Sequence, residues 1–525
     1  VTRHPSLFYW LSLGAFALSL LSKTAVVTLP VVLLLLVWWR RGRIDRRDVG
    51  RTIPFFAMAG LLGLLTVWFQ YHRAIGSVIV RTDSFWARLA GAGRAIWFYL
   101  YKALWPLDLM FVYPRWSMDA SKLLSYLPGL LVAVVLAVGW HYRRQWGRPV
   151  LFALGCFVVM LLPVLGFLNI YFMRYSLVAD HWQYFAILGP IALLAAAWSA
   201  AWSADIPVGV APSLAGADKN VGAPCRLWRA SSHTGVALGG VVLLVLGVLT
   251  WKQARLYADS TTLWQDTLAK NPACWLANNN LGTILANQGQ IDDAIGQYQQ
   301  ALRLEPGDPC VHNNLGIALD KKGQADGAIR EYQEAVRLKP DYAEAHYNLG
   351  VALDKQGQTD GAIRQYQEAL RLKPDYAQAH NNLGVALTRK GQTDDAICQY
   401  QEALRLKPDY AETHNNLGTA LDAKGQTDAA IHQYRETIRL APDHPMAHYN
   451  LANALDEKGQ IDEAIRQYQE ALRLKPDNAD AHNNLGDALQ RQGRSDEAIL
   501  RFEECLRLQP GHAFAHFNLA NALQQ

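Results

Sequence analysis

The first 255 residues contain no glutamate, and their charge is almost entirely of one sign. They hold 24 lysines and arginines against 8 aspartates, a net charge of +16, whereas the remaining residues hold 26 basic against 37 acidic side chains, a net charge of −11. Nucleic acid is not the expected partner, because the arginines of the first half cluster beside apolar runs and the second half is acidic.

Cysteine is scarce, and its spacing shows neither disulfide pairs nor a metal-binding motif. The six cysteines are Cys156, Cys225, Cys274, Cys310, Cys398 and Cys505. We expect them to be ordinary packing residues, with no metal site and no cofactor held by this chain.

Ionisable residues are nearly absent from the apolar runs of the first half, apart from Lys23 and Lys102. This argues against a transporter or channel subunit, because an ion pathway needs such groups. Each of seven runs is near the length that crosses a bilayer, which predicts a polytopic membrane domain in residues 1–202 and a last span at 236–251. The runs are residues 7–21, 25–39, 53–69, 123–140, 149–168, 184–202 and 236–251.

The second half has a strict regularity, a proline every 34 residues. These prolines are Pro272, Pro306, Pro340, Pro374, Pro408, Pro442, Pro476 and Pro510. The clearest repeated unit runs from Asp341 to Pro374 and predicts two helices joined by a turn at Gly357. Apolar residues share one face of each helix, at Ala345, Leu349, Ala352 and Leu353, then at Ala362, Ile363, Tyr366, Ala369 and Leu370.

An aspartate recurs beside the predicted start of the second helix, where we expect it to cap the helix. The copies are Asp292, Asp326, Asp360, Asp394, Asp428, Asp462 and Asp496. The proline of each unit is expected to end the second helix.

The repeated unit resembles the tetratricopeptide repeat. The residues at that family's spacing are, in one copy, Leu315, Gly316, Leu319, Gly323, Ala328, Tyr332, Ala335 and Pro340. We count seven full repeats in residues 273–510, a leading helix in 252–272 and the first helix of a truncated eighth repeat in 511–525. The resemblance implies an all-α, right-handed solenoid with a concave groove as its default binding surface.

One asparagine recurs on the first helix of every unit, and a histidine lies two residues before it in most units. They are Asn280, Asn314, Asn348, Asn382, Asn416, Asn450, Asn484 and Asn518, with His312, His346, His380 and His414 leading the histidine series. An amide both donates and accepts, which suits the backbone of an extended peptide. Similar ladders line the groove of the O-GlcNAc transferase repeats, which this array resembles. The alternative is that each asparagine bonds to the adjacent repeat and sets its register.

Two other uses of the repeats are disfavoured. Repeats that clamp a C-terminal carboxylate need a lysine where this chain has Asn313, Tyr347, Asn381 and Asn415. Histidines one repeat apart lie on helices with axes roughly 8–10 Å apart, too far to share one zinc ion.

The arginine clusters predict the orientation of the chain. Those at residues 40–51 and 143–148 are expected in the cytoplasm, so residues 95–105 are expected to be re-entrant or interfacial. The linker 203–235, rich in glycine, alanine and proline, then returns to the cytoplasm, and the last span carries the repeats outside. We expect a multi-pass protein, most simply of a bacterial inner membrane with periplasmic repeats; the alternative is the lumen of a eukaryotic secretory compartment.

A second resemblance is carried by the segments SKTAVVTLPVVLLLLVWW, RAIWFYLYKALWPLDLMFVYPRW and YSLVADHWQYFAILGP. They resemble the C-terminal part of the membrane domain in GT-C glycosyltransferases, a group that includes transmembrane and tetratricopeptide repeat proteins thought to be protein O-mannosyltransferases. The resemblance covers about the first 250 residues and implies a polyprenyl-phosphate sugar donor. The catalytic base of that family lies in a first external loop absent from this chain, so we expect a fragment, incomplete at both ends, whose catalytic residues are unknown.

Five residues are candidates for contact with a lipid phosphate or for proton transfer. Arg81, Arg115 and Arg174 have guanidinium groups that match phosphate oxygens, and Asp180 and His181 are able to move a proton. The alternative is that they are interfacial anchors. The sequence therefore predicts a membrane-anchored scaffold that binds polypeptide outside the cell and belongs to a protein O-glycosyltransferase, or else a non-enzymatic assembly protein of the cell envelope.

Overall fold

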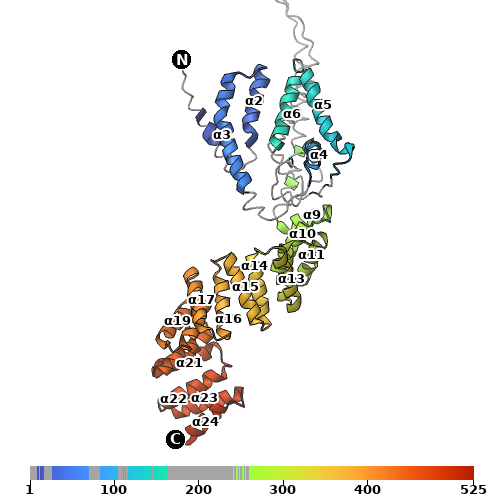
Figure 1. Ribbon diagram of the computed structural model, residues 1–525. Helices are drawn as coiled ribbons and strands as arrows, with labels where there is room; N and C mark the ends of the chain where they lie inside the picture. The colour runs from blue at the N-terminus through green and yellow to red at the C-terminus, as the bar shows by residue number, and fades with distance from the viewer. Residues whose placement is uncertain are drawn as a thin grey trace, which may run out of the picture. The chain divides into compact units, whose positions relative to one another are not determined.

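The computed structural model describes residues 9–10, 12–16, 27–69, 83–104, 110, 113, 116, 118–144, 146–162, 165, 241, 244–245, 248, 251–252, 255 and 259–524. Every regular element among them is a helix, which confirms the all-α prediction for these residues (Figure 1). The chain divides into two compact units, Val1–Leu281 and Gly282–Gln525.

The first unit contains helices of unequal length. They are α2 (Leu29–Arg41), α3 (Arg46–Phe69), α4 (Phe85–Leu104), the 3-10 helix η3 (Leu123–Tyr126), α5 (Leu127–His141), α6 (Gly147–Leu161) and α9 (Ser260–Lys270). The last of these lies within the predicted leading helix 252–272.

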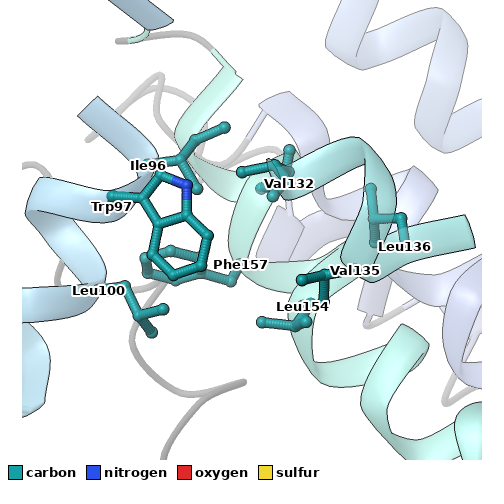
Figure 2. Close-up of a pocket in the computed structure, with 9 residues that line it drawn as sticks. Ile96, Trp97, Leu100, Val132, Val135, Leu136, Leu154 and Phe157 are labelled. Atoms are coloured by element: carbon teal, nitrogen blue, oxygen red, sulfur yellow. The ribbon is translucent and has the colours of Figure 1, made fainter. Parts of the chain in front are cut away.

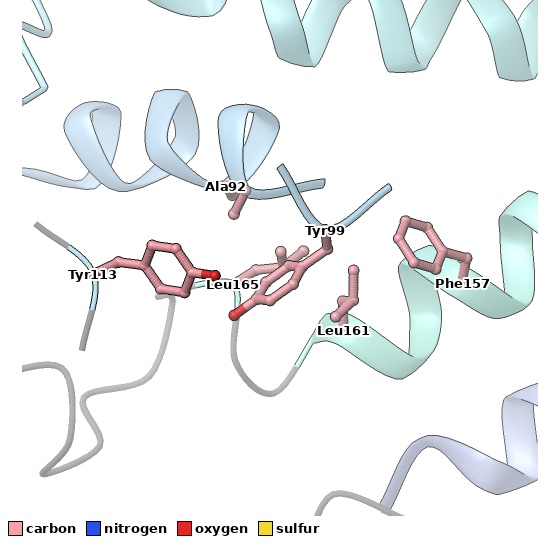
Figure 3. Close-up of a cluster of buried hydrophobic side chains, with 7 residues drawn as sticks. Ala92, Tyr99, Tyr113, Phe157, Leu161 and Leu165 are labelled. Atoms are coloured by element: carbon pink, nitrogen blue, oxygen red, sulfur yellow. The ribbon is translucent and has the colours of Figure 1, made fainter. Parts of the chain in front are cut away.

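Helices α4 and α6 share a buried cluster in which Tyr99, Phe157 and Leu161 are fully covered (Figure 3). The indole Nε1 of Trp97 on α4 donates a hydrogen bond of 2.9 Å to the carbonyl of Pro128 on α5. An apolar gap of about 30 Å³ remains between α4, α5 and α6 (Figure 2). Its exposed lining is apolar, and the one polar atom among its side chains, Trp97 Nε1, is bonded to Pro128, so we assign no binding site to the gap.

Two described helical stretches are long and apolar enough to cross a membrane, Arg46–Trp68 and Leu123–His141. They overlap the spans predicted at 53–69 and 123–140. Helix α6, in the predicted span 149–168, is apolar but shorter, and α2, in the span 25–39, has 13 residues. The span 184–202 and the linker 203–235 lie outside the described residues, so the polytopic domain stays a prediction.

Residues 95–104 belong to helix α4, which has 20 residues and begins at Phe85. Helix α4 is not one of the two described stretches that are long and apolar enough to cross a membrane, so the re-entrant or interfacial placement of residues 95–105 stays a prediction. The apolar run is shorter than the helix because Arg88 and Arg94 interrupt it without interrupting the backbone hydrogen bonds.

The repeats form helical hairpins in which each hairpin packs against the next (Figure 1). The first helices are α10 (Trp275–Asn287), α12 (Pro309–Lys321), α14 (Ala343–Lys355), α16 (Ala377–Arg389), α18 (Ala411–Asp422), α20 (Pro445–Glu457), α22 (Ala479–Arg491) and α24 (Ala513–Gln524). The second helices are α11 (Ile291–Leu304), α13 (Ala325–Leu338), α15 (Thr359–Leu372), α17 (Thr393–Leu406), α19 (Thr427–Leu440), α21 (Ile461–Leu474) and α23 (Ser495–Leu508).

Two glycines give the third hairpin its shape. Gly357 joins α14 to α15 with a φ of +75°, a conformation that side chains disfavour. Gly350 lies against the buried ring of Tyr366, where an added Cβ would stand 2.7 Å from Cε1. Close approach of the two helices therefore requires a small residue at position 350.

The prediction that Asp360 and its equivalents cap the second helices is wrong. The residue before α15 is Gln358, whose side chain makes no capping hydrogen bond, and Asp360 is the second residue inside the helix. Its carboxylate instead pairs with Lys390 of the next hairpin at 2.6 Å. The equivalent pairs are Asp292–Lys322, Asp326–Gln356, Asp394–Lys424, Asp428–Lys458 and Asp462–Gln492.

Candidate functional site

Seven of the recurring asparagines, Asn314 to Asn518, lie on the face made by the first helices α12, α14, α16, α18, α20, α22 and α24, which we call the first-helix face, and Asn280 lies on α10. All are half-buried, and those from Asn348 onward each donate a hydrogen bond to the first helix of the preceding hairpin. The bonds are Asn348 to Asn313 (2.9 Å), Asn382 to Tyr347 (3.2 Å), Asn416 to Asn381 (3.2 Å), Asn450 to Asn415 (3.2 Å), Asn484 to Tyr449 (3.3 Å) and Asn518 to Asn483 (3.1 Å).

These bonds support the register interpretation of the ladder. They do not use all of the hydrogen-bonding capacity of a side-chain amide, which has two donor hydrogens and two acceptor lone pairs. Asn348 and Asn416 each donate one such bond. Peptide contact by the asparagines stays a prediction, as does contact by Asn280 and Asn314, which are half-buried at the same position of their helices.

The histidines of the series join parts of their own repeat. In His346, Nδ1 lies 2.7 Å from Gln365 Oε1 on the second helix, and Nε2 lies 3.1 Å from the carbonyl of Pro340. The same two contacts recur at His312, His380, His414 and His448. The geometry therefore gives these histidines a role in holding each hairpin together, since both ring nitrogens have partners there.

The partner of the histidine changes at the two ends of the series. Burial lowers the pKa of His312, but its hydrogen bonds to the Glu331 carboxylate and to the Pro306 carbonyl outweigh burial and raise the pKa overall. Burial lowers the pKa of His482, and Arg501, at the position of Glu331, lowers it further. The pKa values of the two imidazoles are therefore shifted in opposite directions from the usual value for histidine.

Ion pairs link neighbouring first helices, with an acid in one hairpin and a base 35 residues later. The pairs are Asp320–Lys355 at 2.7 Å, Asp354–Arg389 at 2.6 Å and Asp456–Arg491 at 2.5 Å. Asp422 breaks the series, because the residue 35 positions after it is Glu457. Burial, followed by Glu457, raises the pKa of Asp422, although a hydrogen bond from Thr427 partly offsets them.

Sequence reasoning missed this Asp422–Glu457 pair. The signal was present, because aligned copies place an acid at 457 where other hairpins have Lys355, Arg389 or Arg491. What could not be read was the interaction, because it joins residues 35 positions apart, whereas the repeat period is 34.

The first-helix face is hollowed near its C-terminal end. An open hollow of about 400 Å³ lies across α20, α22 and α24. Amides supply much of its lining, from Asn453, Asn483, Asn484 and Asn518, together with the exposed ring of Phe514. This part of the face offers both polar and aromatic groups to a partner.

Other candidates are distributed differently. Arg81, Arg115, Arg174, Asp180 and His181 all lie outside the described residues. Among the cysteines, Cys156, Cys274 and Cys505 are buried as expected of packing residues, but Cys310 and Cys398 are exposed. For these last two the packing prediction is wrong, and Cys225 lies outside the described residues.

Comparison with known families decides what the hairpins are. The family model for the TPR repeat matches residues 282–323, 318–357, 353–391, 385–425, 423–459 and 453–493, and the model for the tetratricopeptide repeat matches residues 479–512. Residues 282–512 are tetratricopeptide repeats. The predicted resemblance is thus confirmed for this part of the chain, and no curated protein matches the chain.

Solved tetratricopeptide structures resemble it over about a third of its length. YrrB, a TPR protein with an unusual peptide-binding site, is 22% identical, with 35% of this chain and 96% of YrrB covered and a TM-score of 0.32. MamA is 30% identical, with 31% and 95% covered and a TM-score of 0.30. PilF of Pseudomonas aeruginosa is 21% identical, with 41% and 97% covered and a TM-score of 0.38.

Proposed function

We propose that the tetratricopeptide repeats are a scaffold that binds extended polypeptide along the first-helix face. The observation that carries this proposal is the half-buried asparagine ladder, whose amides keep hydrogen-bonding capacity beyond the inter-repeat bonds. Amides at regular spacing bind a peptide backbone independently of its side chains. The hollow across α20, α22 and α24 supplies room beside the same ladder.

The ladder has a matched control inside the chain. Asn348 and Asn416 donate to Asn313 and Asn381, whose side chains are buried, with 5% and 1% of their surface exposed. Replacing either the donors or the acceptors by alanine removes these two inter-repeat bonds, and the acceptor variant also loses the bonds of Asn381 to Thr413 and Asn382, so it is the more severe test of register. Only the donors are exposed enough to reach a peptide.

The experiment measures fluorescence anisotropy of a labelled, unstructured 12-residue peptide of serine, alanine and tyrosine with the full-length chain in detergent. We expect Asn348→Ala with Asn416→Ala to weaken binding, and Asn313→Ala with Asn381→Ala to leave it unchanged. Equal loss in both double variants would favour the register interpretation alone. No binding to the unsubstituted chain would refute the proposal.

The proposal includes attachment to a membrane by the first half. Its support is the exposed apolar surface of η3 and α5, where Leu124 is 81% exposed and Leu130 59% exposed. Apolar surface left in water costs about 25 cal/mol per Å², so such a helix needs a cover, and a bilayer supplies one. Trp140 and Trp146, both exposed, stand where interfacial aromatic residues are common.

Location of the repeats on the external side is part of the same proposal and has a direct test. Cys398 is exposed on α17 and reports on the repeats without an engineered thiol. A maleimide that cannot cross membranes should label Cys398 of the Cys310→Ser variant in intact cells, and adding Cys398→Ser should remove that label, since Cys310 on α12 is exposed as well. Labelling of Cys398 only after lysis would place the repeats in the cytoplasm.

Protein O-glycosylation with a polyprenyl-phosphate sugar is the finer form of the proposal and depends on the resemblance of the first half to GT-C enzymes. Its alternative is a non-enzymatic assembly protein of the cell envelope. Transfer of labelled sugar from a polyprenyl-phosphate donor to a bound serine or threonine peptide separates the two. Binding without transfer by the intact protein would leave the assembly role.

A further inference from the structure

The third and sixth hairpins each contribute two tyrosines, one from each helix, to an arrangement that an asparagine from the first helix of the next hairpin completes. Corresponding residues are Tyr347, Tyr366 and Asn382 in one, and Tyr449, Tyr468 and Asn484 in the other. The ring centroids of the tyrosines are 6.0 Å and 6.1 Å apart, and the asparagine donates to the first tyrosine hydroxyl at 3.2 Å and 3.3 Å. The chain therefore contains two copies of one local structure, 102 residues apart.

The two copies differ in what covers the first tyrosine. In the third hairpin the ring of Tyr376 lies over Tyr347, with centroids 4.8 Å apart, and the Lys373 ammonium stands 4.7 Å from the Tyr376 ring centroid. The same lysine–tyrosine contact recurs at Lys339–Tyr342 and Lys407–Tyr410, at 5.2 Å and 4.7 Å. Tyr376 is thus held by the Tyr347 ring and the Lys373 ammonium, whereas for Tyr342 and Tyr410 the lysine contact recurs without the second ring.

In the sixth hairpin the lysine is kept as Lys475, but the tyrosine is replaced by Asn478. The Asn478 side chain accepts a hydrogen bond of 3.1 Å from the Ala481 amide and so turns back to cap α22. An open hollow of about 670 Å³ lies there, lined by Met446, Tyr449, Lys475, Asp480 and Leu508. The groups that hold a tyrosine ring elsewhere are present without the ring.

We propose that this hollow binds an aromatic side chain of the partner polypeptide, with Tyr449 and Lys475 acting on it as Tyr347 and Lys373 act on Tyr376. The proposal rests on the proposed function, since it supposes a polypeptide on the first-helix face. Met446, 42% exposed at the rim, adds a flexible thioether that makes favourable contacts with rings. The chain itself shows which chemistry fits, because tyrosine occupies the equivalent place in three other hairpins.

Met446 also provides the reporter. It is one of six methionines in the chain and the only one after residue 252. Its methyl signal in the full-length chain, labelled with ¹³C-methyl methionine, is assigned by Met446→Leu. We expect N-acetyl-tyrosinamide to shift this signal saturably, because a bound ring changes the local magnetic field, and N-acetyl-leucinamide to leave it in place.

Two variants share one defect and differ in the hollow. Asn478→Tyr and Asn478→Ala both remove the α22 cap, but the tyrosine supplies the missing ring. We expect the response of Met446 to disappear in Asn478→Tyr and to persist in Asn478→Ala. If N-acetyl-tyrosinamide leaves the Met446 methyl signal of the unsubstituted chain unchanged, or if the response is lost in both variants, the inference is overturned.

Peptide binding separates this inference from the proposed function. We expect the tyrosine-containing 12-residue peptide to bind Asn478→Tyr more than about fivefold more weakly than Asn478→Ala, as for a residue that anchors an interface. Equal binding to both variants with a silent Met446 would refute the aromatic site and leave the scaffold. Absence of peptide binding to the unsubstituted chain, with Met446 still responding to N-acetyl-tyrosinamide, would refute the scaffold instead.

Discussion

Replacing Glu457 by arginine should add a fourth ion pair to the three that link neighbouring first helices. In three places an aspartate pairs with a base 35 residues later, as Asp456 does with Arg491 at 2.5 Å. At Asp422 the corresponding residue is Glu457, whose negative charge helps to raise the pKa of Asp422. Glu457→Arg converts this repulsion into the pair that the rest of the series contains.

The size of the effect follows from the exposure of the existing pairs. In the pair Asp354–Arg389 the acid is 14% exposed and the base 53% exposed. A partly exposed pair of this kind contributes about 0.5 kcal/mol, and removing a like-charge contact contributes about as much again. The gain is therefore about 1 kcal/mol, enough to lower the population of the locally open state about fivefold.

Hydrogen exchange of the amides in α18–α21 measures this gain in the full-length chain. The pKa of Asp422 is raised, so its carboxyl favours the folded state only while protonated. That contribution is complete below the unfolded pKa of about 3.9 and is lost as pH rises through the folded pKa. Burial is the larger cause of this loss and stays, but Glu457→Arg removes the part due to Glu457 and adds an attraction to the ionised carboxylate, so its advantage should be large at pH 7 and small near pH 3.

Two controls test whether the gain comes from the charge at position 457. Glu457→Gln removes the repulsion without adding a pair and should give about half of the gain, or about 0.5 kcal/mol. Salt at 1 M should suppress the arginine's advantage, because the Debye length falls to about 3 Å. Unchanged exchange at pH 7, or a gain that ignores both pH and salt, would show that Asp422 and Glu457 do not interact as described.

Two further predictions concern the hairpins. The pKa of His312 is raised, so its contribution to the free energy of unfolding is complete below about pH 6.5 and falls as pH rises through the folded pKa. The pKa of His482 is lowered, so its contribution is complete above about pH 6.5 and becomes smaller in acid. Opposite pH trends of hydrogen exchange in α12–α13 and α22–α23, corrected for intrinsic rates, would check this, and parallel trends would contradict it. Gly350→Ala should destabilise α14–α15 by about 1 kcal/mol, because a clash of about 2 kcal/mol with Tyr366 exceeds a gain of about 1 kcal/mol in helix propensity. Faster exchange confined to these helices is the expected readout, and slower exchange there would rule out the clash.

The hairpins were predictable because their packing restricts residue type at each position. Gly350 must be small where Tyr366 crosses it, and Gly357 must accept a positive φ, so both appear at fixed spacing in most copies. The partner of Asp360 was not predictable in the same way. An acid in the first turn of a helix interacts favourably with the helix dipole whether or not it caps the helix. The pattern of residues therefore did not show that the Asp360 carboxylate pairs with Lys390.

In the first half, the apolar runs predicted where helices occur better than where they end. Helix α3 starts at Arg46, seven residues before the apolar run at 53–69, because a helix continues through Arg47, Asp48 and Arg51 as long as its backbone bonds form. Hydropathy describes the surroundings of a segment, whereas helix length depends on the backbone. The two agree only where the surroundings change at the helix end.

The stacking residues of the repeats cannot by themselves make binding to the first-helix face specific for one partner. Because Gly350, Tyr366 and the asparagine ladder recur in nearly every hairpin, a peptide that contacts only these groups meets the same chemistry at each step. Discrimination needs positions where one copy departs from the others. Asn478, without the ring that Tyr376 supplies, and Glu457, without the base that Arg491 supplies, are two such departures, and both lie in the sixth hairpin or the loop that follows it. Loss of peptide discrimination after restoring both positions to the common pattern would show that this part of the face selects the partner.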